Sequence, residues 1–336
     1  MIIVISNRII NESSNKEDFF GETLNPQGAD KLRIAKAYYQ GENSPWVIEA
    51  LPKENNFNSD DSLIRNFFLD ITNGIKEQKY RERWVFYNPG FNQSSRSALD
   101  ASQKLSEKYD VDVILFSWPS NPNGRSNSIR DLLEVYSEYQ EALSVAEASA
   151  KALEKAFGIL NNCFLNSPFN NLSRTDIKCT FLSHSLGNYV FENCIKLSSD
   201  NVEEIFDSII LHQADVHNKN HEEWVDNITN SSNIYITINR HDDILELSGT
   251  FHKLQGLNSQ NSNNRLGNNT KNLTANKPRY IDFTKGDNVS RYHNLFFNVD
   301  NQIIWSFFDQ IFKGNSKLSP VFTQSANQSN VYSLIQ

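Results

Sequence analysis

The sequence is poor in the residues that build disulfide-rich or membrane-spanning proteins. It has three cysteines, Cys163, Cys179 and Cys194. This odd number, without a C-x-x-C pair, argues against a disulfide framework and against a zinc ribbon. No apolar run approaches the roughly 18 residues that a spanning helix needs, so any membrane contact would be peripheral. The apolar opening at residues 1–6 is too short for a signal peptide. We therefore expect a cytoplasmic protein with no spanning segment.

Basic charge is also scarce. The chain carries 40 acidic and 32 basic residues, a net charge of -8, and no stretch gathers lysine and arginine into a stripe that could follow phosphates. Nucleic acid is thus a poor partner, and a small molecule is expected instead. No G-x-G-x-x-G motif follows an early strand, which excludes a Rossmann dinucleotide site. We expect neither a cofactor nor a metal.

What the sequence does contain is material for a large core, with 38% hydrophobic and 12% aromatic residues. From about residue 80, short apolar runs alternate with helical patterns, which predicts a mainly parallel sheet with crossover helices. The runs lack strict alternation, as is typical of strands covered on both faces. They lie at residues 84–87, 113–116, 179–182, 206–211, 234–238 and 279–283. The expected fold is α/β, with about eight strands and helices on both faces of the sheet.

The other segments complete a single expected domain over residues 1–312. Residues 1–80 contain short strands joined directly, which favour an antiparallel edge, and then a helix. Residues 128–165 form a long helical pattern that is a candidate cap. The Asn-rich stretch at 255–278 is expected to be a flexible insertion, and residues 313–336 a loose tail.

The most informative motif is Ser183-His184-Ser185-Leu186-Gly187. It leaves a predicted strand and enters a predicted helix, the context of a nucleophile elbow, in which a sharp turn exposes the serine hydroxyl above the sheet. Ser183 and Gly187 supply the small residues that let strand and helix pass closely, although Ser183 replaces the first glycine of G-x-S-x-G. The alternative is an ordinary turn with a capping serine. We predict Ser185 as the nucleophile.

A serine needs a base and an acid, which in this fold follow it in the order acid, then histidine. Asp242 follows the predicted strand at 234–238, at the end of a strand where α/β folds keep their sites. His293 comes after the last strand. We predict Asp242 as the acid and His293 as the base, with Asp215 and Asp243 as alternative acids.

Two other histidines lie near these motifs. His241 competes for the role of base, but it sits beside the acid and would leave His293 without a role. His184, next to the nucleophile, is expected to shape the elbow.

Acyl transfer also needs donors for the oxyanion. The backbone N–H of Leu186 follows the nucleophile and is the first candidate. The second is the N–H of Phe91, with Gly90 allowing close approach in the turn Asn88-Pro89-Gly90-Phe91-Asn92. An ordinary Pro-Gly turn is the alternative there.

Taken together, the sequence resembles a family of largely uncharacterised, mostly bacterial α/β-hydrolases over residues 80–312. The landmarks are residues 88–92, 116–120, 183–188 and 239–245. Pro89 stands where relatives carry histidine, which bears on the oxyanion geometry. The resemblance implies Ser185 as nucleophile, Asp242 as acid and His293 as base. It also suggests that Trp118, in Phe116-Ser117-Trp118-Pro119-Ser120, is a wall of the substrate pocket; the alternative is a buried anchor of the strand end.

The function expected from these residues is a serine hydrolase that cleaves an ester-like bond through an acyl-enzyme intermediate. Three alternatives stay open: transfer of the acyl group to another acceptor, cleavage of a thioester or amide, and an inactive hydrolase fold that serves as a binding or scaffold protein. The expected partner is a small ester or acyl substrate.

Overall fold

The computed structural model describes residues 1–52, 62–121, 132–167, 172–197, 204–254, 264–297 and 300–334. The chain forms two compact units, Met1–Cys179 and Thr180–Gln336. Within the described ranges, no helix combines the length and the apolar character needed to cross a membrane.

The first unit is built on strands in the order β6-β7-β1-β4-β5. Their bounds are β1 (Ile2–Ser6), β4 (Arg33–Tyr38), β5 (Val47–Ala50), β6 (Arg83–Asn88) and β7 (Asp112–Ser117). β1 and β6 both pair parallel with β7, whereas β4 and β5 are antiparallel. All residues of β1 and β7 are buried, because both faces of these strands are covered. The predicted antiparallel N-terminal edge is confirmed. A separate pair, β2 (Arg8–Ile10) and β3 (Phe20–Leu24), was not predicted.

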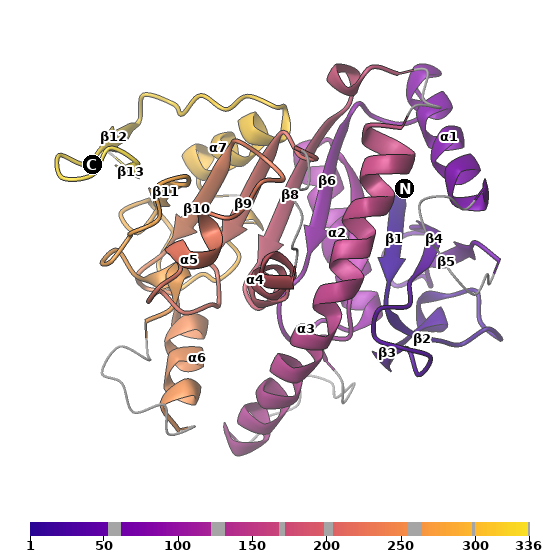
Figure 1. Cartoon of the computed structure of the whole chain (residues 1–336), viewed down its shortest axis with the longest axis horizontal. Helices are drawn as coiled ribbons and strands as arrows, with labels where there is room; N and C mark the ends of the chain where they lie inside the picture. The colour runs from indigo at the N-terminus through magenta and orange to yellow at the C-terminus, as the bar shows by residue number, and fades with distance from the viewer. Residues whose placement is uncertain are drawn as a thin grey trace. The chain divides into compact units, whose positions relative to one another are not determined.

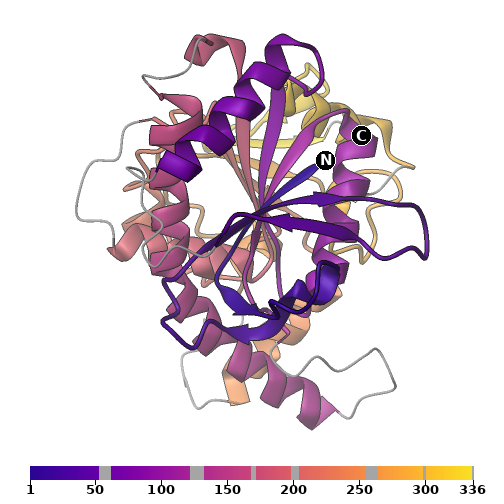
Figure 2. The same cartoon turned by 90° about the vertical axis from the view of Figure 1, so that its right-hand side faces the viewer.

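The helices of this unit lie on both faces of its strands, as Figures 1 and 2 show for α2 and α3. The α-helices are α1 (Ser62–Lys76), α2 (Ser95–Tyr109) and α3 (Leu132–Leu160), and the shorter turns are η1 (Glu17–Phe19), η2 (Asn161–Leu165) and η3 (Arg174–Asp176). The buried alanines Ala142, Ala146 and Ala150 repeat every four residues, so α3 presents a narrow side to the core. α3 and η2 fall within the predicted helical segment 128–165; residues 128–131 lie outside the described residues. A cap role for the segment stays a prediction.

The second unit has the strand order β12-β13-β11-β10-β9-β8. The strands are β8 (Lys178–His184), β9 (Ser208–His212), β10 (Ile234–Ile238), β11 (Arg279–Asp282), β12 (Phe322–Gln324) and β13 (Val331–Leu334). All pairs except β12 with β13 are parallel. The helices are α4 (Gly187–Leu197), α5 (Glu222–Val225), α6 (Asp243–Leu254) and α7 (Gln302–Phe312), with the short turns η4 (Leu266–Asn268) and η5 (Leu295–Phe297). α4 and α7 lie on opposite faces (Figure 1). The loops that follow β8 to β11 therefore meet at one edge of this unit's sheet.

The C-terminal tail is not loose, contrary to the prediction for residues 313–336. β13 adds to β11, and β12 pairs with β13. Phe322 and Leu334 are buried, and the Phe322 ring packs on Phe283. The tail joins the sheet because the outer side of β11 offers unpaired backbone groups. Apart from the separate β2–β3 pair, the described strands number eleven, above the predicted eight or so.

The described part of the predicted insertion at 255–278 is also fixed. Residues 255–263 lie outside the described residues, but Leu266 and Gly267 donate backbone hydrogen bonds to Val216 and Ala214. Leu266 is fully buried. The asparagine-rich composition of the segment gave no indication of this contact, because Ala214 and Val216 follow β9, about 50 residues earlier in the chain.

Candidate active site

Ser185 lies between β8 and α4 in a conformation that non-glycine residues rarely adopt. Its φ is 52°, in the left-handed region. Two backbone hydrogen bonds hold it there: its N–H donates to the carbonyl of His212, and its carbonyl accepts from the N–H of Asp215, each at 3.1 Å. The residue is 4% exposed. This is the sharp strand-to-helix turn that a nucleophile elbow requires.

Asn188, in the first turn of α4, stabilises the elbow through side-chain hydrogen bonds to the backbone. Its Nδ2 donates to the carbonyls of Ser183 and Ser185, at 3.1 and 3.0 Å, and lies 3.4 Å from the carbonyl of His212. The side chain is fully buried. The asparagine therefore ties the end of β8, the elbow and the end of β9 together, which gives a physical reason for its place in the motif.

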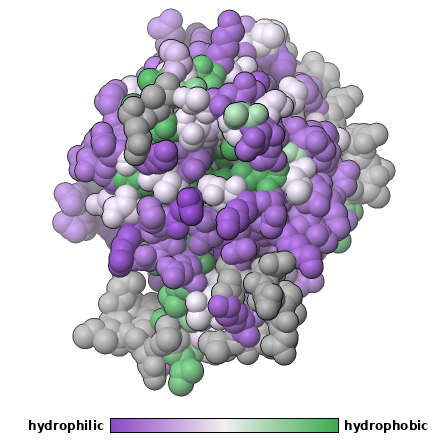
Figure 3. Space-filling view, turned by 90° about the vertical axis from the view of Figure 1, so that its left-hand side faces the viewer, coloured by the Kyte–Doolittle hydropathy of each residue, from purple (hydrophilic) through white to green (hydrophobic). Residues whose placement is uncertain are grey.

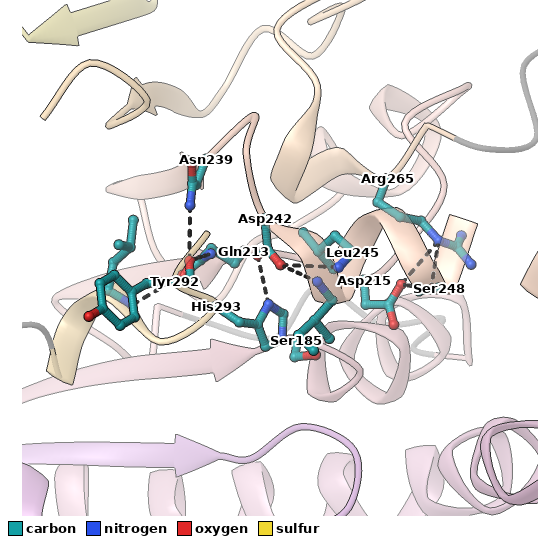
Figure 4. A network of polar contacts seen from close by, with 12 residues as sticks. Ser185, Gln213, Asp215, Asn239, Asp242, Leu245, Ser248, Arg265, Tyr292 and His293 are labelled. Carbon is teal, nitrogen blue, oxygen red and sulfur yellow. Dashed lines mark hydrogen bonds and ion pairs between the residues drawn. The ribbon is translucent and has the colours of Figure 1, made fainter. Parts of the chain in front are cut away.

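The structure brings His293 and Asp242 together. Nδ1 of His293 lies 2.7 Å from Oδ2 of Asp242 (Figure 4). The other oxygen, Oδ1, accepts from the N–H groups of Ile244 and Leu245 at the start of α6, where the helix end favours a negative charge. A neutral imidazole that donates from Nδ1 presents an unprotonated Nε2. That Nε2 is buried and has no hydrogen-bond partner within the described chain.

Gln213 joins the acid to the loop that carries the histidine. Its Nε2 donates to Oδ2 of Asp242 at 2.5 Å and to the carbonyl of Tyr292 at 2.8 Å, and its Oε1 accepts from the N–H of Leu295 at 3.2 Å. Asn239 adds a second tie to the same loop, with Nδ2 2.9 Å from the carbonyl of Tyr292. Figure 4 shows these contacts around Asp242.

Two further histidines line the inner side of the site. The ring of His184 lies 4.8 Å from that of His293 and 5.5 Å from that of His212. Burial, with a smaller effect of the His293 charge, lowers the pKa of His184 to about 3. Burial also lowers the pKa of His212 well below its usual value. Both imidazoles are therefore neutral near pH 7, and Nε2 of His184 donates to the carbonyl of His293 at 2.9 Å.

The other residues considered as acid or base have different surroundings. The carboxylate of Asp215 is buried and contacts the hydroxyl of Ser248 at 2.5 Å and Nε of Arg265 at 3.0 Å. Asp243 forms an exposed ion pair with Arg291. His241 is exposed. Of the acids considered, Asp242 is the one that the structure places against His293.

The predicted second oxyanion donor and pocket wall belong to the first unit. Trp118 is fully buried and its Nε1 donates to the carbonyl of Pro89 at 3.0 Å. Gly90 is buried and Phe91 half-buried, and the Phe91 ring packs edge-on against Tyr139. Ser185 and Leu186 belong to the second unit, so the roles of Phe91, Gly90 and Trp118 in its chemistry stay predictions.

The loop that carries Phe91 is held by a buried arginine in the same unit. Nη2 of Arg8 donates to the carbonyls of Gln93 and Trp118, at 2.8 and 2.7 Å, and Nη1 pairs with Glu22. The loops after β6 and β7 are thereby joined. The sequence did not indicate this role of Arg8, because three of its partners, Gln93, Ser117 and Trp118, lie more than 80 residues away in the chain.

The chain matches the family described as "Alpha/beta hydrolase of unknown function (DUF900)" over residues 69–310. No curated protein matches it. The match covers most of the chain, including β6 to β11 and the loops that carry Ser185, Asp242 and His293. The protein therefore belongs to this family of α/β hydrolases.

Proposed function

We propose that the protein is a serine hydrolase that cleaves an ester-like bond. His293 Nε2 takes the proton of Ser185 as its Oγ attacks the substrate carbonyl carbon, and then gives that proton to the departing alcohol oxygen. Water, deprotonated by His293 in turn, attacks the acyl-enzyme and releases the acid. Asp242 orients the imidazole and stabilises its charged form, while the N–H group of Leu186 holds the oxyanion.

The observation that carries this proposal is that Nε2 of His293 has no hydrogen-bond partner within the described chain. Its Nδ1 is occupied by Asp242 at 2.7 Å, so the ring is fixed with Nε2 available as a base. The residue predicted to use that base, Ser185, stands at an elbow with a φ of 52°. A hydrogen bond between nucleophile and base often tightens only when substrate is bound.

The surface next to the acid and the base favours a substrate with an apolar group. Ile244, two residues after Asp242, is 50% exposed, and Tyr292, the residue before His293, is 58% exposed. The face that Figure 3 shows is mostly hydrophilic, with hydrophobic residues visible in small areas. An acyl or alcohol group that covers either side chain would gain binding energy from apolar burial.

Labelling with a fluorophosphonate probe, which reacts with activated serines, tests the proposal. The wild type should be labelled at Ser185, and Ser185→Ala and His293→Ala should abolish labelling. Two matched controls should be labelled like the wild type: Ser144→Ala, at an exposed serine of α3, and His241→Ala, at the exposed histidine beside Asp242.

The outcome separates an enzyme from a binding protein. Labelling that requires both Ser185 and His293 would support a working serine hydrolase, and hydrolysis of p-nitrophenyl esters of increasing chain length would then define the acyl group. A folded wild type that stays unlabelled, or labelling that survives in Ser185→Ala, would contradict the proposal.

A further inference from the structure

We infer that Gln213 is a positioning residue that holds Asp242 and His293 in place relative to each other. This inference rests on the proposed function. Gln213 directly follows β9 and comes from neither the acid loop nor the base loop. Its side-chain amide nevertheless contacts both. It does not touch the reacting atoms, so its effect passes through Asp242 and His293.

Both N–H groups and the oxygen of this amide are hydrogen-bonded. One N–H donates to Oδ2 of Asp242 and the other to the carbonyl of Tyr292, while Oε1 accepts from Leu295. Tyr292 and Leu295 flank His293 on its two sides. The amide therefore fixes both ends of the short segment that carries the base, relative to the carboxylate that must meet it.

The Gln213 amide binds the same carboxylate oxygen of Asp242, Oδ2, that contacts His293. Oδ1 is already held by the N–H groups of α6, and those bonds alone fix only one end of the carboxylate. Oδ2 receives both the Gln213 amide and Nδ1 of His293. With both oxygens held, the carboxylate plane is fixed and Oδ2 faces the imidazole. A base held in this way is better oriented for proton transfer.

The backbone of Gln213 is also held in an unusual conformation. Its φ is 40°, a left-handed value that glutamine seldom adopts. The N–H donates to the hydroxyl of Thr237 at 3.2 Å, and Gly267 packs so closely on residues 213 and 214 that a Cβ there would overlap their backbone. Such strain persists where the surrounding structure enforces it, and it is common at functional sites.

Two substitutions of similar length test this role. Gln213→Met removes all three side-chain hydrogen bonds, and Gln213→Glu keeps an acceptor for Leu295 but removes both donors. Loss of a hydrogen bond to a charged group should lower kcat about 10- to 100-fold, because such bonds contribute roughly 1.5–3 kcal/mol. KM for a p-nitrophenyl ester should change less than about twofold, since the amide does not contact the substrate site. Gln310→Met, at a half-buried glutamine of α7, is the matched control.

A second measurement reports on positioning without depending on activity. The proton shared by His293 Nδ1 and Asp242 should give a downfield ¹H NMR signal in the wild type, and this signal should broaden or disappear in both Gln213 variants while the fold, followed by circular dichroism, is retained. Gln310→Met should keep the signal.

The two readouts separate the inference from the proposed function. If the wild type is not labelled by the fluorophosphonate probe but the Gln213 variants lose the downfield signal, the proposed function fails and the positioning role stands. If kcat and the signal are both unchanged in folded Gln213→Glu or Gln213→Met, the positioning role is wrong. A rise in KM with an unchanged kcat would also overturn it, because that pattern would indicate loss of substrate binding instead.

Discussion

Nδ1 of His293 lies 2.7 Å from Oδ2 of Asp242, although 51 residues separate them in the chain. The two residues come from the loops after neighbouring parallel strands, β10 and β11. Because the carboxyl ends of parallel strands meet at one edge of a sheet, the fold itself brings these loops together. The pair fixes the tautomer of the histidine and is the relationship on which the proposed chemistry depends.

Asp242→Asn should abolish most of the activity while preserving the fold. Asparagine can donate to Nδ1 and so favour the wrong tautomer, which leaves Nε2 protonated and unable to act as a base. In a serine-histidine-aspartate triad this change lowers kcat by about 10⁴-fold. Steady-state hydrolysis of a p-nitrophenyl ester measures the effect.

The two alternative acids provide the comparison. Asp243→Asn should leave kcat within about twofold, because its carboxylate forms only an exposed ion pair. Asp215→Asn should instead lower the free energy of unfolding by about 3 kcal/mol, since it leaves Arg265 buried without its anion. A loss of kcat at Asp215 larger than that at Asp242, in folded protein, would make Asp215 the acid.

The conformation of Ser185 predicts an unusual order of stability for two inactive variants. Ser185→Gly and Ser185→Ala both remove the hydroxyl, but only glycine adopts a φ of 52° without strain. Ser185→Gly should therefore be more stable than Ser185→Ala by about 1 kcal/mol in urea unfolding. At Ser144, within α3, the order should reverse by a similar amount, because alanine is the better helix former. The same order at both positions would show that the elbow is not strained.

The strands and the elbow that form the site could be predicted from the sequence, because the patterns that indicate them are local. The strand at 234–238 consists of β-branched and aromatic residues, which favour strands, and the elbow needs only small residues around Ser185. Asp242 and His293 were named from the order of motifs. The strand and the elbow depend on neighbouring residues, whereas the choice of acid and base depends on the order of motifs along the chain.

The supporting contacts were not predictable, because they join distant parts of the chain. Gln213 contacts Asp242 and Tyr292, 29 and 79 residues away, and a glutamine after a strand has no local pattern that indicates such a role. The tail was misjudged for the same reason. Val331–Leu334 is too short to be recognised as a strand until β11 is present to pair with it.

Gly267 should be intolerant of even a methyl group. A Cβ at this position would overlap the backbone of Gln213 and Ala214, and backbone cannot move aside without disturbing the site. Gly267→Ala should lower the free energy of unfolding by about 2 kcal/mol, within the usual range for overpacking. Gly158→Ala is the matched control: no atom lies within 4 Å of its added Cβ, and in α3 the change should stabilise by up to about 1 kcal/mol. Equal effects in thermal unfolding would contradict the close packing at Gly267.

Burial of neutral His184 should make the protein less stable in mild acid. Its pKa is lowered from 6.5 to about 3 in the folded chain, so between these values the unfolded state binds the extra proton. Stability from this group is therefore present above pH 6.5 and is lost as the pH falls, by about 2 kcal/mol between pH 7 and pH 5. His184→Gln keeps a donor for the carbonyl of His293 and does not titrate. Between pH 7 and pH 5 its free energy of unfolding, measured in urea, should therefore fall by about 2 kcal/mol less than that of the wild type. Ser144→Ala should follow the wild type. Parallel curves for His184→Gln and the wild type would show that His184 is protonated equally in both states, and would remove it as the source of acid sensitivity.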